Sequence, residues 1–292
     1  MSNSVFIDLL LPFSLALIMF GMGLGLTKQD FSRLWQTPKS VFVGLIGQLL
    51  LLPLLALLIC ILFELPAPLA VGLMILAASP GGTTSNVLSQ LANANLALSV
   101  TLTSICTLVC VFSTPWIIHF SLQYFVSTGA PEFSLLGTSM GLILITLLPV
   151  LVGIWVRQTY SSFAIRYEVY FRRFSLGFMI TMILALLIKE REMLVDAFQQ
   201  VFWACMALSL GSILLGVLIA KVTKMSDKDA VTLGIEVGIQ NATMSILIAI
   251  SFLHEPTYAI TASVYGLCMY LAPLPLIFWY KNKLKKGIAV SS

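Results

Sequence analysis

Residues 69–91 read LAVGLMILAASPGGTTSNVLSQL, an apolar run of membrane-crossing length that is interrupted at its centre by polar and helix-breaking residues. A helix of about 20 apolar residues crosses the roughly 30 Å hydrocarbon core of a bilayer. Pro80 removes one backbone donor, and Gly81 and Gly82 loosen the helix directly after it. Freed backbone groups are tolerated at membrane depth only where they line a cavity or meet a ligand. The run therefore predicts a transmembrane helix that is broken at a binding site.

A second apolar run, residues 230–252, has the same kind of polar centre and reads AVTLGIEVGIQNATMSILIAISF. Glu236 is the only acidic residue well inside any predicted span. A carboxylate at the bilayer centre costs roughly 2.5–3.5 kcal/mol on insertion scales, so it normally has a partner or a function. No Lys or Arg is expected at that depth to pair with it. A bound cation is therefore the expected compensation for Glu236.

The composition excludes a soluble domain. Hydrophobic residues make up 59% of the 292 positions and charged residues 10%, and the mean hydropathy is +1.01. We predict an all-α polytopic membrane protein with no extramembrane domain of any size. Its nine predicted spans are 5–26, 40–63, 69–91, 96–118, 134–156, 174–188, 195–220, 230–252 and 258–280. The sixth is short for a full crossing, and extending it back through Tyr170 and Phe171 would place Arg172 and Arg173 at the membrane interface.

The distribution of basic residues predicts the orientation of these spans. With the N-terminus outside, 14 of the 16 Lys and Arg residues lie in inside segments, and only Lys189 and Arg191 lie outside. This is the bias of the positive-inside rule. We predict a bacterial inner-membrane protein with a periplasmic N-terminus and a cytoplasmic C-terminus. The net charge of +4 then reflects orientation and not nucleic-acid binding.

The two interrupted runs occupy corresponding places in the predicted topology. Four spans begin at residue 5 and four at residue 174, and the third of each set is interrupted. The two sets start on opposite sides of the membrane, which predicts an inverted-topology repeat joined by span 134–156. The N-termini of the half-helices suit an anionic group, and the unwound carbonyls suit a cation. This arrangement favours a secondary transporter.

Other polar residues at depth add oxygen ligands to the predicted site. Gln48 lies in the second span, and Ser99 and Thr103 lie one turn apart on the fourth. Hydroxyl, amide, carbonyl and carboxylate oxygens suit a hard cation such as Na⁺ and disfavour transition metals. Each residue also has a structural alternative: a bond to its own helix, contact between helices, a kink at Pro80, or a protonated acid at Glu236.

Three segments resemble the bile acid:sodium symporter family. They are residues 80–86 (PGGTTSN) with 94–100 (ANLALSV), residues 236–241 (EVGIQN), and residues 20–24 (FGMGL) with Asp30, Phe31, Pro38 and Lys39. The resemblance covers nearly the whole chain and matches a nine-span form. It implies one transporter domain over residues 1–292, with two discontinuous crossing helices and alternating access. The implied core comprises spans 40–63, 69–91, 96–118, 195–220, 230–252 and 258–280, and the implied panel comprises spans 5–26, 134–156 and 174–188.

The resemblance also implies the site residues. The ligands of a first sodium ion would be Ser85, Asn86, Ser99, Thr103 and Glu236. Those of a second would be Gln48, Gln240, the shared Glu236 and the main-chain carbonyls of Val237 and Ile239. Thr83 and Asn241, at the tips of the crossing helices, are the expected substrate contacts, and Thr84 would border the substrate pocket. The family often has a small residue at the position of Thr84 and Met at that of Ile239.

The function that these observations favour is sodium-coupled import of a small organic anion, such as a bile acid, a pantoate-like acid or another monocarboxylate. The alternatives are a proton-coupled carrier or cation/proton antiporter with Glu236 as proton carrier, and a channel. An intramembrane enzyme is disfavoured because His119 and His254 lie near the outer face and Glu236 has no second acid. The expected partners are the substrate and membrane lipid, with no nucleic acid and no obligate protein partner.

Overall fold

The computed structural model describes residues 10–126, 133–189 and 191–290, and within them the regular secondary structure is helical. Residues 5–9 of the first predicted span lie outside this part of the chain. Six helical stretches of the described chain are long and apolar enough to cross a membrane: Pro38–Leu62, Leu96–Phe125, Leu135–Thr159, Ser161–Leu186, Phe198–Val222 and Pro256–Lys285. The shorter apolar helices Leu11–Leu24, Ala67–Ala78 and Ala242–Phe252 fall in the other three predicted spans. The prediction of an all-α polytopic membrane protein is confirmed.

The helices follow one another with short connections. In chain order they are α2 Leu11–Leu24, α3 Lys28–Gln36, α4 Pro38–Ile46, η2 Gly47–Leu51, α5 Leu52–Leu62, α6 Ala67–Ala78, α7 Thr83–Leu91, α8 Leu96–Phe125, α9 Leu135–Leu142, η3 Ile143–Leu147, α10 Leu148–Thr159, α11 Ser161–Lys189, α12 Arg191–Val222, α13 Asp227–Gly238, α14 Ala242–Leu247, η4 Ile248–Phe252, η5 Pro256–Tyr258, α15 Ala259–Leu271 and α16 Leu274–Val290.

Both predicted helix breaks are present. The first separates α6 from α7 at residues 79–82, and the second separates α13 from α14 at residues 239–241. The backbone is extended at Ser79 and Gly82 and again at Ile239. Pro80 and the glycines beside it account for the first break, because the α-helical hydrogen-bond ladder cannot continue through them.

Two of the long stretches contain a π-helical turn just before a proline. The turn η2 precedes Pro53 and the turn η3 precedes Pro149. Proline has no backbone N–H and its ring crowds the carbonyl four residues earlier, so the ladder re-forms with a wider turn. Gln48 lies within η2 and is buried, so the π-helical turn places a polar side chain in the interior of the protein.

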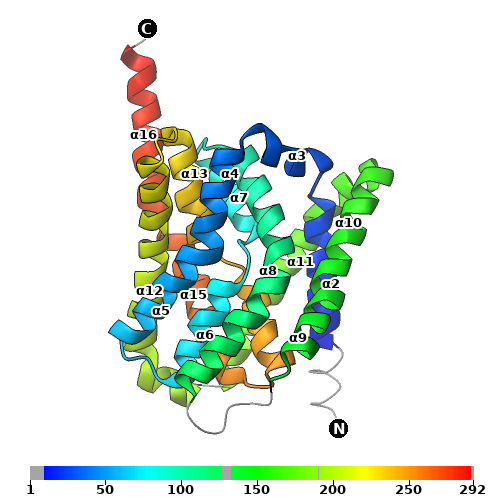
Figure 1. The fold of residues 1–292 in the computed structure, drawn as a ribbon, viewed down its shortest axis with the longest axis vertical. Helices are drawn as coiled ribbons and strands as arrows, with labels where there is room; N and C mark the ends of the chain where they lie inside the picture. Colours follow the sequence, from blue (N-terminus) through cyan, green and yellow to red (C-terminus); the bar gives the residue numbers. More distant parts are fainter. Residues whose placement is uncertain (1–9, 127–132, 190, 291–292) are drawn as a thin grey trace.

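The arrangement of the helices separates an interior from a peripheral layer (Figure 1). The helices α6, α13, α14 and α15 are buried along almost their whole lengths, together with much of α8. Peripheral helices expose apolar stripes, such as Leu210, Leu214 and Leu218 on α12. Such stripes suit contact with lipid chains, as expected for helices on the outside of a membrane protein.

A close backbone contact holds α2 against α10. A side chain built on Gly153 would place its Cβ 2.4 Å from the carbonyl oxygen of Phe20 and 2.8 Å from the Cα of Gly23. Small residues let membrane helices approach closely enough for extensive van der Waals contact. The helix α2 also packs against α11, so α2, α10 and α11 lie together on one side of the molecule.

The sixth membrane helix starts earlier than predicted. We predicted a span over residues 174–188, whereas α11 begins at Ser161 and the apolar stretch identified in it is Ser161–Leu186. Residues 161–173 contain no Gly or Pro, so nothing in this segment interrupts the helix although it carries charge. The predicted last span differs as well, because Ala272 and Pro273 separate α15 from α16.

A charged cluster connects three helices at the face where α13 begins. The Asp227 carboxylate accepts hydrogen bonds from Lys221 at the end of α12 and from Lys283 on α16. These hydrogen bonds from the two ammonium groups lower the pKa of Asp227 to about 2. The carboxylate also lies in the first turn of α13, where the helix dipole favours a negative charge.

We expect Asp227→Asn to lower the thermal stability of the purified protein modestly, since exposed ion pairs each contribute about 0.2–1 kcal/mol. A lowered pKa stabilises the folded state above the unfolded pKa near 3.8, and this contribution is lost as the pH falls toward 2. The melting-temperature difference from wild type should therefore be constant at neutral pH and shrink below about pH 4. Lys285→Gln, on the same helix as Lys283, is the control. A difference that grows on acidification would contradict this role.

Candidate functional site

The two helix breaks meet each other. Gly81 and Gln240 form an isolated antiparallel bridge. The backbone N–H of Gly82 donates to the Ile239 carbonyl at 3.2 Å, and that of Asn241 donates to the Pro80 carbonyl at 3.0 Å. Each break frees backbone groups that cannot be left unpaired in an apolar interior. Pairing the two breaks satisfies one donor and one carbonyl from each of them and brings the four half-helix ends together.

Glu236 lies beside this crossing and accepts two hydroxyl hydrogen bonds. Its side chain is buried, and Ser99 Oγ donates to Oε2 at 2.6 Å while Thr103 Oγ1 donates to Oε1. Ser99 and Thr103 come from one face of α8, as their spacing predicts. Gly81 leaves room for the carboxylate, because a Cβ there would lie 2.9 Å from Oε1. The arrangement holds both carboxylate oxygens as hydrogen-bond acceptors.

The other residues predicted for the first ion surround Thr103. Thr103 Oγ1 lies 3.5 Å from Ser85 Oγ and 3.5 Å from Asn86 Oδ1, and 3.0 Å from the carbonyl oxygen of Ser99. A hydroxyl has only one proton to donate. Oxygen acceptors therefore outnumber donors around this atom, which is the chemistry that a hard cation fits.

The residues predicted for the second ion form a chain of amides. Gln48 Nε2 donates to Gln240 Oε1 at 2.7 Å, and Gln240 Nε2 donates to the Val237 carbonyl at 2.8 Å. The remaining oxygen, Gln48 Oε1, is buried and has no hydrogen-bond partner among the described residues. A buried acceptor without a partner is costly unless something else satisfies it. A cation beside Gln48 would supply that interaction, so the donor set fits Na⁺. The Ile239 carbonyl, also predicted for this ion, accepts from Gly82.

Several interior hydroxyls support the crossing although we assigned them no role from the sequence. Ser89 Oγ donates to Ser99 Oγ at 3.3 Å, and Ser79 and Ser245 pair through their hydroxyls at 2.9 Å. Tyr265 donates to the Gly238 carbonyl at the end of α13, at 2.9 Å. Ser89 lies one turn after Ser85, so helical spacing could have identified it.

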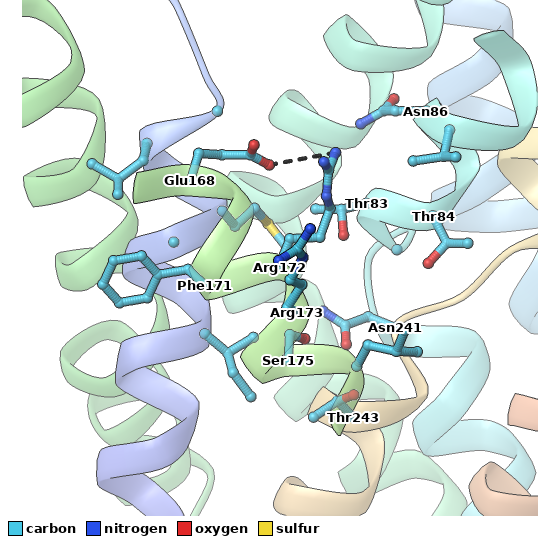
Figure 2. Close-up of a pocket in the computed structure, with 18 of the residues that line it drawn as sticks. Thr83, Thr84, Asn86, Glu168, Phe171, Arg172, Arg173, Ser175, Asn241 and Thr243 are labelled. Carbon is cyan, nitrogen blue, oxygen red and sulfur yellow. Dashed lines mark ion pairs between the residues drawn. The ribbon is translucent and has the colours of Figure 1, made fainter. Parts of the chain in front are cut away.

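A cavity of about 750 Å³ adjoins the crossing. One wall carries Thr83, Thr84 and Asn86 at the start of α7, followed by Asn241 and Thr243 from the second break (Figure 2). The structure thus brings the three predicted substrate contacts, Thr83, Thr84 and Asn241, to one cavity next to the predicted ion ligands.

The opposite wall was not anticipated. It is formed by α11, which contributes Glu168, Phe171, Arg172, Arg173 and Ser175 (Figure 2). The expectation that the two arginines lie at the membrane interface stays a prediction, and the structure adds that both line the cavity. They do so because α11 is continuous helix from Ser161 onward and runs along this side of the cavity. Arg172 Nη1 lies 3.7 Å from Glu168 Oε1, one turn earlier on the same helix.

Comparison with known proteins gives a family. Residues 12–197 match the model of the Sodium Bile acid symporter family. The uncharacterized sodium-dependent transporter YocS of Bacillus subtilis is 31% identical over 279 residues, which is 95% of this chain and 84% of that protein. The probable sodium/metabolite cotransporter BASS2 of rice chloroplasts is 28% identical over 92% of this chain and 63% of its own length. The human ileal sodium/bile acid cotransporter is 27% identical over 54% of this chain and 45% of its own length.

The paired helix breaks, the buried acid with its oxygen-rich surroundings and the match over nearly the whole chain agree with one another. The family and the relatives are transporters, so this site belongs to a transporter and is not an enzyme active site. The chain belongs to the sodium bile acid symporter family and is a multi-pass, sodium-coupled membrane transporter.

Proposed function

We propose that this chain imports a small organic anion together with two sodium ions, which bind around an ionised Glu236. The ions and the anion occupy adjacent sites on the two sides of the paired breaks. A panel of α2, α9, α10 and α11 moves against a core of the remaining helices, so that the cavity opens to each side of the membrane in turn.

The observation that carries this proposal is the excess of oxygen acceptors around Glu236. Both carboxylate oxygens accept hydroxyl protons, and Thr103 has more acceptors near it than it has protons to donate. An ionised Glu236 can accept from both hydroxyls, whereas a protonated Glu236 would donate to one of them, and the proton of that hydroxyl would then need another acceptor. The partnerless Gln48 Oε1 supports a second cation nearby. The arrangement favours metal-ion coupling over proton coupling.

The anion would bind where the cavity meets the crossing. Asn241 Oδ1 accepts from the backbone N–H of Met244, so its amide NH₂ group is left to face the cavity. The nine-residue helix α7 begins at Thr83 without a side-chain cap. Its first N–H groups and positive dipole end suit an acidic group of the substrate. Names of relatives that mention bile acids and metabolites agree with an organic anion.

Coupling would follow because both ligands stabilise the same arrangement of the breaks. Ions on one side and the anion on the other contact residues that are joined by the Gly81–Gln240 bridge. A ligand shifts a conformational equilibrium by its difference in affinity for the two states. Sodium that orders the bridge would therefore raise affinity for the anion, and the anion would raise affinity for sodium equally.

The orientation that we propose places the α3 face in the cytoplasm of a bacterial cell, since basic residues gather there and on α16. The cavity lining includes Gly25, Arg157 and Gln90, which lie at the ends of α2, α10 and α7 toward that face (Figure 1). The structure would then represent the state in which the substrate site is open to the cytoplasm.

The proposal can be tested with purified protein in two stages. In detergent, NaCl should raise the melting temperature, and organic anions that bind should raise it further only when sodium is present. In proteoliposomes, uptake of such an anion should require an inward sodium gradient. Potassium and choline chloride are the controls. Uptake that continues in choline, or that a pH gradient alone drives, would contradict sodium coupling and favour the proton-carrier alternative.

A further inference from the structure

The cavity is positively charged on the wall that faces away from the ion ligands. Its lining includes Arg157, Arg172 and Arg173, and the acidic residue among the lining residues is Glu168. The three cationic groups therefore exceed the anionic ones by two formal charges. The two arginines of α11 project toward the wall that carries Thr83, Asn86 and Asn241 (Figure 2).

We propose that Arg172 and Arg173 form a second anion subsite, so that the transported substrate is an organic dianion. This inference rests on the proposed function, and it specifies the class of anion. One acidic group binds the donors at the crossing, Thr83 and Asn241. The other binds the guanidinium groups of α11 across the cavity, and the substrate thereby joins the two walls.

The state of the two arginines supports this role. Arg173 makes no ion pair with any described residue. Arg172 is paired only at 3.7 Å with Glu168, and both side chains of that pair keep access to solvent. A guanidinium group binds a carboxylate, sulfonate or phosphate through two parallel hydrogen bonds. A substrate could thus replace Glu168 as the partner of Arg172 and take up Arg173 without breaking any buried contact.

The Asn241 amide, which is the proposed donor at the crossing, has a fixed orientation. Asn241 is 8% exposed, its oxygen caps α14 by accepting from Met244, and its NH₂ group donates no hydrogen bond to a described residue. An amide NH₂ group that faces the cavity and has no protein partner is available to donate to an acceptor on a ligand. The cavity therefore offers hydrogen-bond donors on both walls, as two separated acidic groups require.

Charge balance gives a consequence for energetics. Two sodium ions carried with a monoanion would move one net positive charge inward, whereas two sodium ions carried with a dianion move none. Import of the dianion should therefore be insensitive to membrane potential, although it requires a sodium gradient.

The test uses straight-chain dicarboxylates from malonate to adipate, each compared with its own half-amide, which has the same length and one charge fewer. The readout is thermal stabilisation of the full-length protein in NaCl. At least one diacid should bind about 10- to 100-fold more tightly than its half-amide, the range for a hydrogen bond to a charged group. Arg173→Gln and Arg172→Gln should each reduce this preference, and the double variant should abolish it.

The matched control is Arg166→Gln, which removes an arginine from the same helix at a position outside the cavity lining. Arg173→Lys should retain the preference for the second charge only partly, since lysine lacks the planar fork of arginine. Glu168→Gln should strengthen diacid binding because it frees Arg172, and a merely structural role for these residues does not predict such a gain.

The outcomes separate this inference from the proposed function. Stabilisation by sodium alone, measured against choline chloride, reports the ion site. If sodium stabilises the protein but no diacid exceeds its half-amide, or if the preference persists in the double variant, the anion subsite is wrong and the sodium site stands. If sodium itself has no effect, the proposed function fails. If anionic lipid vesicles displace the diacid equally from wild type and from Arg166→Gln, both of which keep Arg172 and Arg173, these two arginines bind lipid headgroups and the inference is overturned.

Discussion

We expect Glu236→Gln to abolish sodium-dependent stabilisation and sodium-driven uptake and to leave the protein folded. The amide has the size of the carboxylate and keeps one oxygen to accept from Ser99 or Thr103. It loses the negative charge that we propose both sodium ions share. Without that charge, two cations would have to leave water for a site of neutral oxygens, and the loss of solvation would not be offset.

Two further variants make the Glu236 result interpretable. Glu64→Gln removes an exposed carboxylate far from the crossing and should change neither sodium response nor stability. Glu236→Asp keeps the charge on a side chain that is one methylene shorter, so it cannot reach both hydroxyls as Glu236 does. Its sodium affinity should fall between that of wild type and that of Glu236→Gln. Sodium dependence that survives in Glu236→Gln would remove this residue from ion binding.

Gly81→Ala should raise the sodium concentration for half-maximal stabilisation by about 10- to 100-fold, the range seen when a metal ligand loses its support. The new Cβ would lie 2.9 Å from Glu236 Oε1, which is closer than such contacts are found. The carboxylate is the end of a flexible side chain and can shift, so the fold should survive. The shift would move it away from the position in which Ser99 and Thr103 hold it.

The matched control for Gly81→Ala is Gly177→Ala on α11, where an added Cβ would meet no atom within 4 Å. Both variants make the same chemical change in a helical membrane protein. Titration with NaCl, followed by the melting temperature, measures the difference between them. Equal sodium affinities in the two variants would show that Gly81 does not set the position of the carboxylate.

Much of the architecture could be predicted because it depends on local chemistry. Hydropathy marks the spans, and Pro80 with its glycines cannot continue a helix, so the break between α6 and α7 follows from the residues themselves. Ser99 and Thr103 share a helix face by their spacing, and the structure brings both to Glu236. The inverted repeat was inferred from the positions of the two interrupted spans, whereas the division into panel and core and the roles of the ion ligands came with the family resemblance, and all of these stay predictions.

Other features depended on contacts that sequence patterns do not report. Arg172 and Arg173 follow a charged segment. The sequence pattern of a charged helix end is the same whether its side chains contact lipid headgroups or line a cavity. Only the packing of α11 across from α7 distinguishes the two cases. The partnerless oxygen of Gln48 likewise emerges only once Gln240, which is 192 residues away, has taken up its amide group.

The bridge between the two breaks constrains how selectivity in this scaffold could be redesigned. Residues 81 and 240 face each other in the bridge that the hydrogen bonds of their chain neighbours hold, so a substitution made there to suit a new cargo also disturbs the ion ligands on the far side. The α11 wall has no such attachment, because its arginines belong to a separate helix and keep access to water. Substitutions intended to change the cargo should therefore be made first on α11, because they would leave the recognition of the driving ion unchanged.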